Sequence, residues 1–534
     1  MSRENENETW SGVPLTSLPK TGPGSSLFLQ YPLDNLPNDE HSGCVCLTPQ
    51  SLSHPASKLQ DSWDAYHVRM PWSKMNLYRE VKDGETLMKS KWETIKNTLR
   101  TKSIQSSYDL QESILSYSPK YRGHEDWSFS TLHKLMSEVL TKEETEKFFK
   151  DTLPKMINIL LSSDSIITSP VPLLVSGKSQ SIALTQEQAS VLLVNAFFCT
   201  YPLRNANGSH FRNYPHINFN TLFGRGTRTP ETKIQELKCL INYFTRITES
   251  TPSGILTFSR VVLPSKSVPN WEQSKNRMSK LHITSEGSIE TEGQGMLQVD
   301  FANKFVGGGV LTRGMVQEEI RFSVCPELLA SLLFTEALDD NEVLLMLGAE
   351  QFSQYQGYSR TFTYDGPLKD MTDLDEQGIR KTAIVAMDAL KFTNVGDDGQ
   401  LQFDKVKINR ELNKAFIGFS NHGAISSELQ AVATGNWGCG AFGGDVRLKF
   451  LIQLMAASEN MRDMAYFTFG DKTLVNEAGK IHRLLVKKGV TVGQLYKMIL
   501  NYCQKSGTKS GEELYMDILR KLEKKKKDGK CSLF

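Results

Sequence analysis

Hydrophobic residues follow two different spacings along the chain. Between residues 61 and 212 they recur every three or four positions, as in KWETIKNTL, STLHKLMSEVL and QEQASVLLVNAFFCT, and this spacing predicts helices. Between residues 213 and 505, short β-rich runs such as GILTFSRVVL, MLQVDFANKFV and TAIVAMDAL alternate with helical segments. The first region therefore predicts an all-α accessory domain, and the second an α/β domain in which helices flank a central mixed sheet.

The two ends of the chain lack a sustained apolar period. Residues 1–60 contain seven of the 20 prolines, and residues 506–534 are mainly polar and basic. Such segments bury too little apolar surface to offset the entropy that is lost on ordering. We therefore expect a flexible leader and a basic C-terminal tail around two folded units, which also suits a chain of 534 residues.

Net charge does not indicate a particular partner, because 62 basic and 60 acidic side chains leave a formal charge of +2. A polyanionic ligand would have to be held by local backbone amides and a few placed side chains. The eight cysteines show no CxxC spacing and no histidine at the intervals typical of metal ligands, so we expect neither a zinc site nor a disulfide framework. Scattered thiols instead suit a reducing compartment, and we find no signal peptide or membrane-spanning stretch.

The most informative segment covers residues 297–322, LQVDFANKFVGGGVLTRGMVQEEIRF. A strand-like run leads into three glycines, Gly307 to Gly309, and a polar triplet, Gln317 to Glu319, follows between apolar flanks. Successive glycines permit positive φ and let backbone amides approach a ligand closely, although a tight turn beside a surface QEE is an alternative. Two buried neighbouring carboxylates would repel each other, which predicts a raised pKa. Since sequence neighbours point in different directions, we expect one to be an acid and the other to position the substrate.

A second glycine cluster, ATGNWGCGAFGGD, spans residues 433–445 and precedes an apolar helical segment. Glycine-rich backbone before a helix presents unpaired amides to an anion, which predicts a diphosphate cradle. A flexible surface loop is the alternative. The cluster matches neither the GxxxxGK[ST] nor the GxGxxG pattern, which disfavours an NAD-dependent enzyme on a doubly wound sheet.

GGG, seven residues, then QEE, with the VDFAN run before them, resembles the signature of the poly(ADP-ribose) glycohydrolases, a macrodomain-type family, and the resemblance extends over about residues 61–504. It implies that Glu319 is the catalytic acid/base and that Glu318 orients the ribose at the cleaved bond. Asp300, Asn303 and Gln317 would support that site. The resemblance assigns substrate binding to a further set of residues: Ile289, Glu290, Gly307, Gly308, Gly309, Tyr358, Gly438, Cys439, Gly440, Ala441, Phe442 and Phe469.

Within that set, Phe469 and Tyr358 are the residues expected to clamp adenine, because aromatic rings stack on bases. Without the resemblance, the YFTF context of Phe469 favours a core position. The composition around Tyr358 indicates nothing by itself.

The resemblance implies hydrolysis of ribose–ribose O-glycosidic bonds in poly(ADP-ribose), which releases mainly ADP-ribose from modified proteins and needs no metal or other cofactor. A monomer that works in the nucleus or cytoplasm, in the response to DNA damage, and that does not read nucleic acid directly is expected. A non-catalytic macrodomain that only binds ADP-ribose is a second hypothesis, but such a protein has no need of two adjacent glutamates.

The last residues raise a separate question of membrane attachment. RKLEKKKKDGKCSLF contains a basic run, and its final four residues, beginning at Cys531, fit the C-a-a-X prenylation pattern. A basic segment is a common second membrane signal beside one lipid. A solvated tail without lipid, whose lysines serve nuclear import or contact the polymer, is the alternative.

Overall fold

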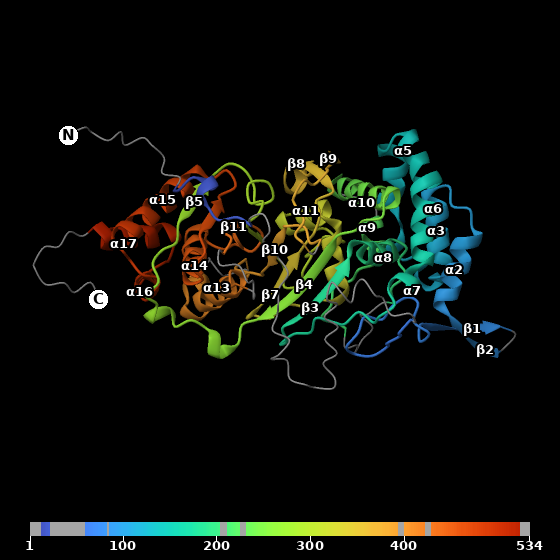
Figure 1. Ribbon diagram of the computed structural model, residues 1–534, viewed down its shortest axis with the longest axis horizontal. Coiled ribbons are helices and arrows are strands. Elements are labelled where there is room, and N and C mark those ends of the chain that lie inside the picture. The colour runs from blue at the N-terminus through green and yellow to red at the C-terminus, as the bar shows by residue number, and fades with distance from the viewer. Residues whose placement is uncertain are drawn as a thin grey trace, which may run out of the picture.

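The computed structural model describes residues 12–21, 59–82, 85–202, 211–224, 231–376, 378–393, 400–421 and 429–523. Figure 1 shows helices at both ends of the molecule and a sheet between them. One large core joins the N-terminal helices to one face of the sheet, and a second core joins the C-terminal helices to the other face. The α/β class and the helices flanking a central sheet are therefore confirmed.

The central sheet has eight strands in the order β3-β4-β7-β10-β6-β11-β12-β5. The pairs from β3 to β10 are antiparallel and those from β10 to β5 are parallel, so the sheet is mixed as expected. The strands are β3 (Gln180–Thr185), β4 (Ile255–Val262), β7 (Glu342–Leu347), β10 (Ala383–Ala386), β6 (Leu297–Asp300), β11 (Val432–Gly435), β12 (Met464–Phe467) and β5 (Leu281–Thr284). The inner strands are buried along their whole length because helices cover both faces.

The N-terminal helices form one layer beside the sheet. They are α2 (Lys91–Thr101), α3 (Ser107–Ser116), α4 (Ser130–Lys134), α5 (Lys142–Lys147), α6 (Leu153–Leu161), α7 (Ser163–Ile166), α8 (Gln186–Phe197), α9 (Asn220–Phe223) and α10 (Glu231–Glu249). Helix α8 begins after Thr185, whose hydroxyl accepts a hydrogen bond from the Gln188 amide at 3.0 Å. Thr185 therefore caps the N-terminus of this helix.

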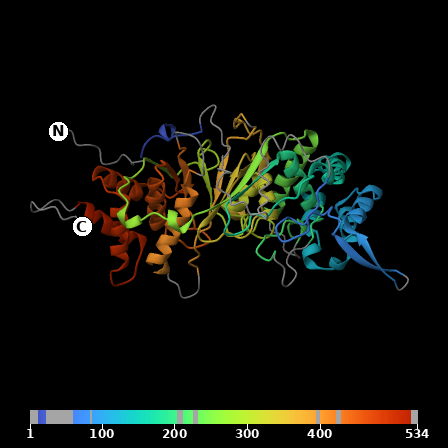
Figure 2. The same cartoon turned by 60° about the horizontal axis from the view of Figure 1, so that its bottom comes forward.

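Two pieces of strand interrupt the region that we predicted to be entirely helical. A hairpin of β1 (Leu77–Lys82) and β2 (Glu85–Ser90) projects from the far end of the helical layer (Figure 2), and β3 pairs with β4 at the edge of the central sheet. A short apolar run does not distinguish a strand from a helix, and β3 is a strand because β4 lies beside it. Helix α10 follows residue 213 in the sequence but packs among the N-terminal helices. The packing therefore does not mark a domain boundary between residues 212 and 213, and this boundary stays a prediction.

The second core contains the helices that follow the strands of the sheet's parallel half. They are α13 (Lys405–Gly418), α14 (Val446–Glu459), α15 (Lys472–Lys487), α16 (Val492–Cys503) and α17 (Gly511–Glu523), while α11 (Gln317–Val324) and α12 (Ser331–Phe334) lie on the side of the first core. A small hairpin of β8 (Ser353–Gln356) and β9 (Thr363–Pro367) stands beside α10.

Helix α17 corrects the prediction that residues 506–534 form only a tail. Leu514, Tyr515, Ile518 and Leu522 are buried against α14, α15 and α16. These four positions form one apolar stripe on the helix. The charged residues between them make the segment polar on average, so its composition does not indicate a buried helix. The C-a-a-X pattern and the basic run lie outside the described residues.

A short part of the predicted leader is ordered, which corrects a second expectation. The Val13 amide donates to the Leu281 carbonyl at 2.8 Å, and the Ala431 amide donates to the Pro19 carbonyl at 2.8 Å. Leu18 is buried beside Ile289. Backbone hydrogen bonds therefore tie residues 12–21 to the edge strand β5 and to the residue that precedes β11, which composition does not reveal.

No helix within the described ranges has the length and apolar character to cross a membrane. In the same part of the chain, no three His, Cys, Asp or Glu side chains are grouped so that they could hold a metal ion. The five cysteines found there are all free thiols.

Candidate active site

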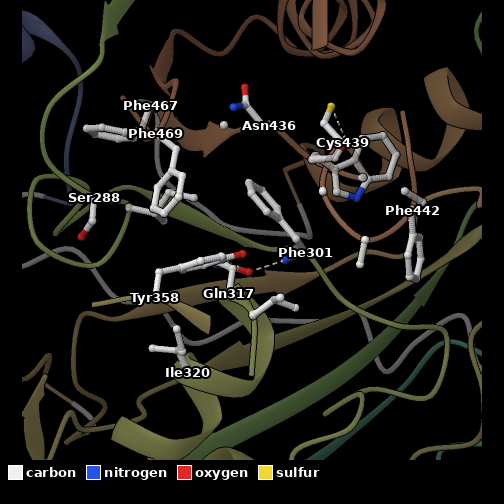
Figure 3. A pocket seen from close by; sticks show the side chains of 18 of the residues that line it. Ser288, Phe301, Gln317, Ile320, Tyr358, Asn436, Cys439, Phe442, Phe467 and Phe469 are labelled. Atoms are coloured by element: carbon white, nitrogen blue, oxygen red, sulfur yellow. Dashed lines mark hydrogen bonds between the residues drawn. The ribbon is translucent and has the colours of Figure 1, made fainter. Parts of the chain in front are cut away.

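A cavity of about 400 Å³ opens where the parallel strands end. The loops after β5, β6, β11 and β12 supply most of its lining, together with the start of α11 and the β8–β9 hairpin. Figure 3 shows aromatic side chains from several of these loops around the opening. Ligand sites in α/β proteins commonly lie at the carboxyl ends of the strands, where separate loops converge.

The two neighbouring glutamates of the QEE triplet occupy the first turn of α11. Glu318 is 2% exposed and Glu319 is 6% exposed. Three residues around them, Val316, Gln317 and Ile320, line the cavity. A helix N-terminus favours carboxylates, because its amides point toward them.

Backbone amides hold both glutamate side chains. Glu318 accepts hydrogen bonds from Asn303 at 2.9 Å and from Gly307 at 2.6 Å, and Glu319 accepts from Gly309 at 2.8 Å and from Val316 at 2.8 Å. All four carboxylate oxygens therefore have a fixed donor. Such donors preorganise a reacting group, because its orientation is set before the substrate binds.

The glycine triplet serves these carboxylates more directly than we predicted from the sequence. Gly307 and Gly308 have φ of 93° and 53°, and a Cβ on Gly308 would stand 2.5 Å from Glu318 Oε2 and 2.5 Å from Glu319 Oε1. None of the three glycines is among the residues that line the cavity. The triplet thus makes room for the glutamates, while its assignment to substrate binding stays a prediction.

Asp300, at the end of β6, is buried beside the two glutamates. Neither of its carboxylate oxygens has a hydrogen-bond partner among the described residues. Burial raises the pKa of Asp300 to about 8 against the opposing charge of Arg321, and the charges of Glu319 and Glu290 add to the rise. Burial also raises the pKa of Glu318, to which the charges of Asp300 and Glu319 contribute. The cluster therefore retains protons at neutral pH.

This raised pKa leads to a prediction about stability and pH. In the unfolded chain Asp300 ionises near its ordinary pKa of 3.8, whereas in the folded protein it keeps its proton up to about pH 8. The folded state binds more protons between these values, so the contribution of Asp300 to stability falls as pH rises from about 4 to 8. We expect the melting temperature of the wild type to fall relative to that of Asp300→Asn over this range. Thermal unfolding of both proteins at pH 5, 6, 7 and 8 measures it, and a difference that does not change with pH contradicts the assignment.

The second glycine cluster forms the loop between β11 and α14. Gly438 has a φ of 74°, and a Cβ there would stand 2.5 Å from the Cβ of Ala389. Gly438, Cys439, Gly440, Ala441 and Phe442 all line the cavity.

Amides of this loop, rather than those of the helix, are available to an anion. The Asp445 carboxylate already caps α14, accepting from Arg447 and Leu448 at 2.9 and 3.0 Å. Within the described residues, the amides of Gly440, Ala441 and Phe442 have no acceptor. A diphosphate cradle would therefore use amides of the glycine-rich loop, the segment to which the sequence analysis assigns it.

Aromatic side chains close one end of the cavity. Phe469 and Tyr358 point toward each other from separate loops, with ring centroids 4.6 Å apart and planes at 58° (Figure 3). Phe469 is 68% exposed and has a φ of 55°, so it is not the core residue that its local sequence suggests. Ile289 and Glu290 line the same cavity. An exposed ring that borders a cavity is suited to stacking on a flat ligand.

This exposure leads to a prediction for Phe469→Ala. We expect ADP-ribose binding to weaken by about 1–3 kcal/mol, the value of one base stacked on an aromatic ring. The melting temperature should stay near that of the wild type, because the side chain contributes little to the core. Calorimetry with ADP-ribose and a thermal unfolding scan measure the two effects. Unchanged affinity contradicts the stacking role.

The structure brings together most of the residues that the sequence analysis named. Ile289, Glu290, Gln317, Tyr358, Phe469 and all five residues of 438–442 line the cavity, while Asp300, Asn303, Glu318, Glu319 and the glycine triplet lie directly behind it. Three lining residues, Gly435, Asn436 and Trp437, belong to the predicted glycine cluster. The other lining residues were missed: Gly287, Ser288, Phe301, Ala302, Val316, Ile320, Tyr355, Ala389, Val446 and Phe467. Position along the chain could have indicated some of the lining residues, since Phe301 and Asn436 directly follow buried strands.

Comparisons with known proteins agree with this geometry. Residues 140–260 match the helical domain of poly(ADP-ribose) glycohydrolase, and residues 268–476 match the macrodomain fold of the same family. The chain is 32% identical to poly(ADP-ribose) glycohydrolase 1 of Arabidopsis thaliana, over 70% of this chain and 83% of that protein. It is 30% identical to poly(ADP-ribose) glycohydrolase 2 of Caenorhabditis elegans, over 74% of this chain and 80% of that protein.

Proposed function

The chain belongs to the poly(ADP-ribose) glycohydrolase family, and from this premise we propose which of its residues carry out the reaction. It is a glycosidase that hydrolyses the ribose–ribose O-glycosidic bonds of poly(ADP-ribose), releasing mainly ADP-ribose and reversing protein poly-ADP-ribosylation. The assignment of individual residues below is our proposal.

Glu319 acts as the general acid and then as the general base. In its protonated form it gives its proton to the departing ribose oxygen as the glycosidic bond breaks, which leaves an oxocarbenium-like sugar. As a carboxylate it then takes a proton from the water that attacks the anomeric carbon. The amides of Gly309 and Val316 hold its two oxygens, and this supports a role that depends on orientation.

Glu318 and Asp300 support this step from behind. Glu318, held by the amides of Asn303 and Gly307, orients the ribose at the cleaved bond. Asp300 is the third carboxyl group beside the two glutamates. Because neighbouring negative charges repel, at least one group of this cluster stays protonated when the substrate binds.

The other residues that line the cavity determine how the substrate is oriented in it, from adenine to the cleaved ribose. Adenine lies against Phe469 and Tyr358 with Ile289 and Glu290 beside it, and the diphosphate lies on the free amides of residues 440–442. The ribose then reaches the start of α11. Phe442, which also lines the cavity, packs against the sugars.

One observation carries this proposal: two glutamates are held by glycine-loop amides beside a cavity that offers both an exposed aromatic pair and free amides. An ADP-ribose-binding macrodomain without activity needs the cavity but not the oriented glutamates. Incubation of purified protein with poly(ADP-ribose), followed by chromatography of the products, separates the two hypotheses. Free ADP-ribose supports hydrolysis, whereas bound but intact polymer supports a binding module.

The cellular setting is part of the same proposal. We propose a monomer that acts on poly-ADP-ribosylated proteins in the nucleus or cytoplasm. The free state of all five described cysteines supports a reducing compartment.

Membrane attachment through Cys531 rests on the C-terminal sequence alone. Intact-mass measurement of protein from its native cells decides the question. A prenyl adduct with loss of the last three residues establishes an anchor, and an unmodified Phe534 excludes it.

A further inference from the structure

We propose that Lys233 and Glu236 of helix α10 are positioning residues for catalysis, because they fix the loop that holds Glu319. This inference rests on the proposed role of Glu319. It assigns a part in the reaction to the helical layer, which does not otherwise supply a group to the described lining of the cavity.

Lys233 makes three hydrogen bonds, two of them to the glycine loop. Its ammonium donates to the Val310 carbonyl at 2.7 Å, to the Gly314 carbonyl at 2.9 Å and to Glu236 Oε2 at 2.5 Å. Lys233 is 3% exposed and Glu236 is 1% exposed. An ammonium has three donors, so each proton is used and the side chain has one fixed geometry.

The two carbonyls lie on either side of the backbone that encloses Glu319. Gly309, which donates to Glu319, immediately precedes Val310, and the Gly314 amide closes the loop by donating to the Gly309 carbonyl at 3.0 Å. A Cβ on Gly314 would collide with the Glu319 carboxylate. Movement of this loop therefore displaces both the Gly309 amide that donates to Glu319 and the Gly314 backbone that packs against its carboxylate.

Helix α9 supports the same loop from the same layer. The Thr221 hydroxyl donates to the Leu311 carbonyl at 2.8 Å. Three carbonyls of the loop, at residues 310, 311 and 314, are thus bound by side chains of α9 and α10. A loop rich in glycine has many accessible conformations, and these bonds select one.

Glu236 balances the charge that this arrangement buries. Burial raises the pKa of Glu236 to about 7, the Lys233 ammonium opposes that rise, and the charge of Glu319 adds to it. The carboxylates of Glu236 and Glu319 are thus close enough to interact, and the ammonium bonds both Glu236 and the loop around Glu319. Replacing only the lysine by an apolar residue would leave a buried, unpaired carboxylate, so the first test replaces both groups together.

The experiment compares the double variant Lys233→Met/Glu236→Gln with the wild type. Replacing a buried ion pair by neutral groups of similar size is often tolerated, so we expect a folded protein. We expect kcat on poly(ADP-ribose) to fall about 10–100-fold, the loss typical of a misplaced catalytic group. The Kd of ADP-ribose should stay within about threefold, because the adenine and diphosphate contacts lie on other loops.

Lys414→Met is the matched control. Lys414 is also a buried lysine that binds two carbonyls and one carboxylate, those of Asp339, Glu342 and Asp388, and none of these lines the cavity. This variant should lose stability while kcat, measured well below its melting temperature, stays within about threefold of the wild type. If the double variant does not fold, Lys233→Gln is measured in the same way, with a loss of about 3–10-fold expected.

Glu319→Gln, assayed in parallel, distinguishes the positioning role of Lys233 from the catalytic role of Glu319. An inactive Glu319→Gln beside a double variant with wild-type kcat overturns the positioning role and leaves the proposed function intact. An active Glu319→Gln overturns the proposed catalytic role of Glu319, on which the positioning role depends. A double variant with normal kcat and weakened ADP-ribose affinity also overturns the inference, because Lys233 would then serve binding.

Discussion

Replacement of Glu319 by glutamine should abolish hydrolysis of poly(ADP-ribose) and largely preserve binding of ADP-ribose. The amide keeps the shape of the side chain and can still accept from one of the two backbone amides, but it cannot transfer a proton. Acid/base groups typically contribute about 10²–10⁴-fold to the rate. Turnover measured by release of ADP-ribose, with the Kd of ADP-ribose from calorimetry, tests both parts.

Glu318→Gln is the companion variant for this prediction. It should also reduce turnover severely, but with weaker binding at the cleaved linkage, because Glu318 orients the ribose. Retention by Glu319→Gln of more than about a tenth of the wild-type kcat would exclude Glu319 as the acid/base.

The second large effect is expected for Gly308→Val. Gly308 has a φ of 53°, and a Cβ there would stand 2.5 Å from both Glu318 Oε2 and Glu319 Oε1. From the sequence alone, a side chain here is expected to occupy the place of the ligand. The structure instead predicts that it displaces the two carboxylates, so hydrolysis should fall at least about 100-fold. Release of ADP-ribose from polymer measures the loss.

Gly123→Val is the control for backbone strain. Gly123 has a φ of 83°, but a Cβ there meets no atom within 4 Å. It should therefore show the strain of a β-branched residue at positive φ without any effect on the glutamates. If Gly308→Val loses no more activity than Gly123→Val, the glycine triplet is not needed to make room for the carboxylates.

Much of the architecture and the site could be predicted because local patterns encode them. The buried strand 383–386 is apolar throughout, as is typical of strands covered on both faces, and its sequence therefore indicates its place in the sheet. The glycine triplet and the QEE triplet are separated by seven residues, so a short loop keeps them near each other. The sequence therefore singled out Glu318, Glu319 and their glycines as one segment, and the family resemblance supplied the roles expected of them.

Other features depend on partners that are distant in sequence. Residues 180–185 are a strand because β4 pairs with them, and α17 is ordered because α14, α15 and α16 cover its apolar stripe. Phe469 has the sequence context of a core residue, but its backbone turns out of the sheet and leaves the ring exposed.

The two glutamates and Lys233 differ in whether local sequence or tertiary packing reveals their place in the site. By itself the sequence predicted the α/β class and singled out the two neighbouring glutamates and the two glycine loops, because each depends on residues close together along the chain. Only the tertiary structure decided that a lysine 86 positions before Glu319, in helix α10, holds the loop around that glutamate. Such a bond forms when packing brings two segments within about 3 Å, and no local spacing of residues encodes that approach.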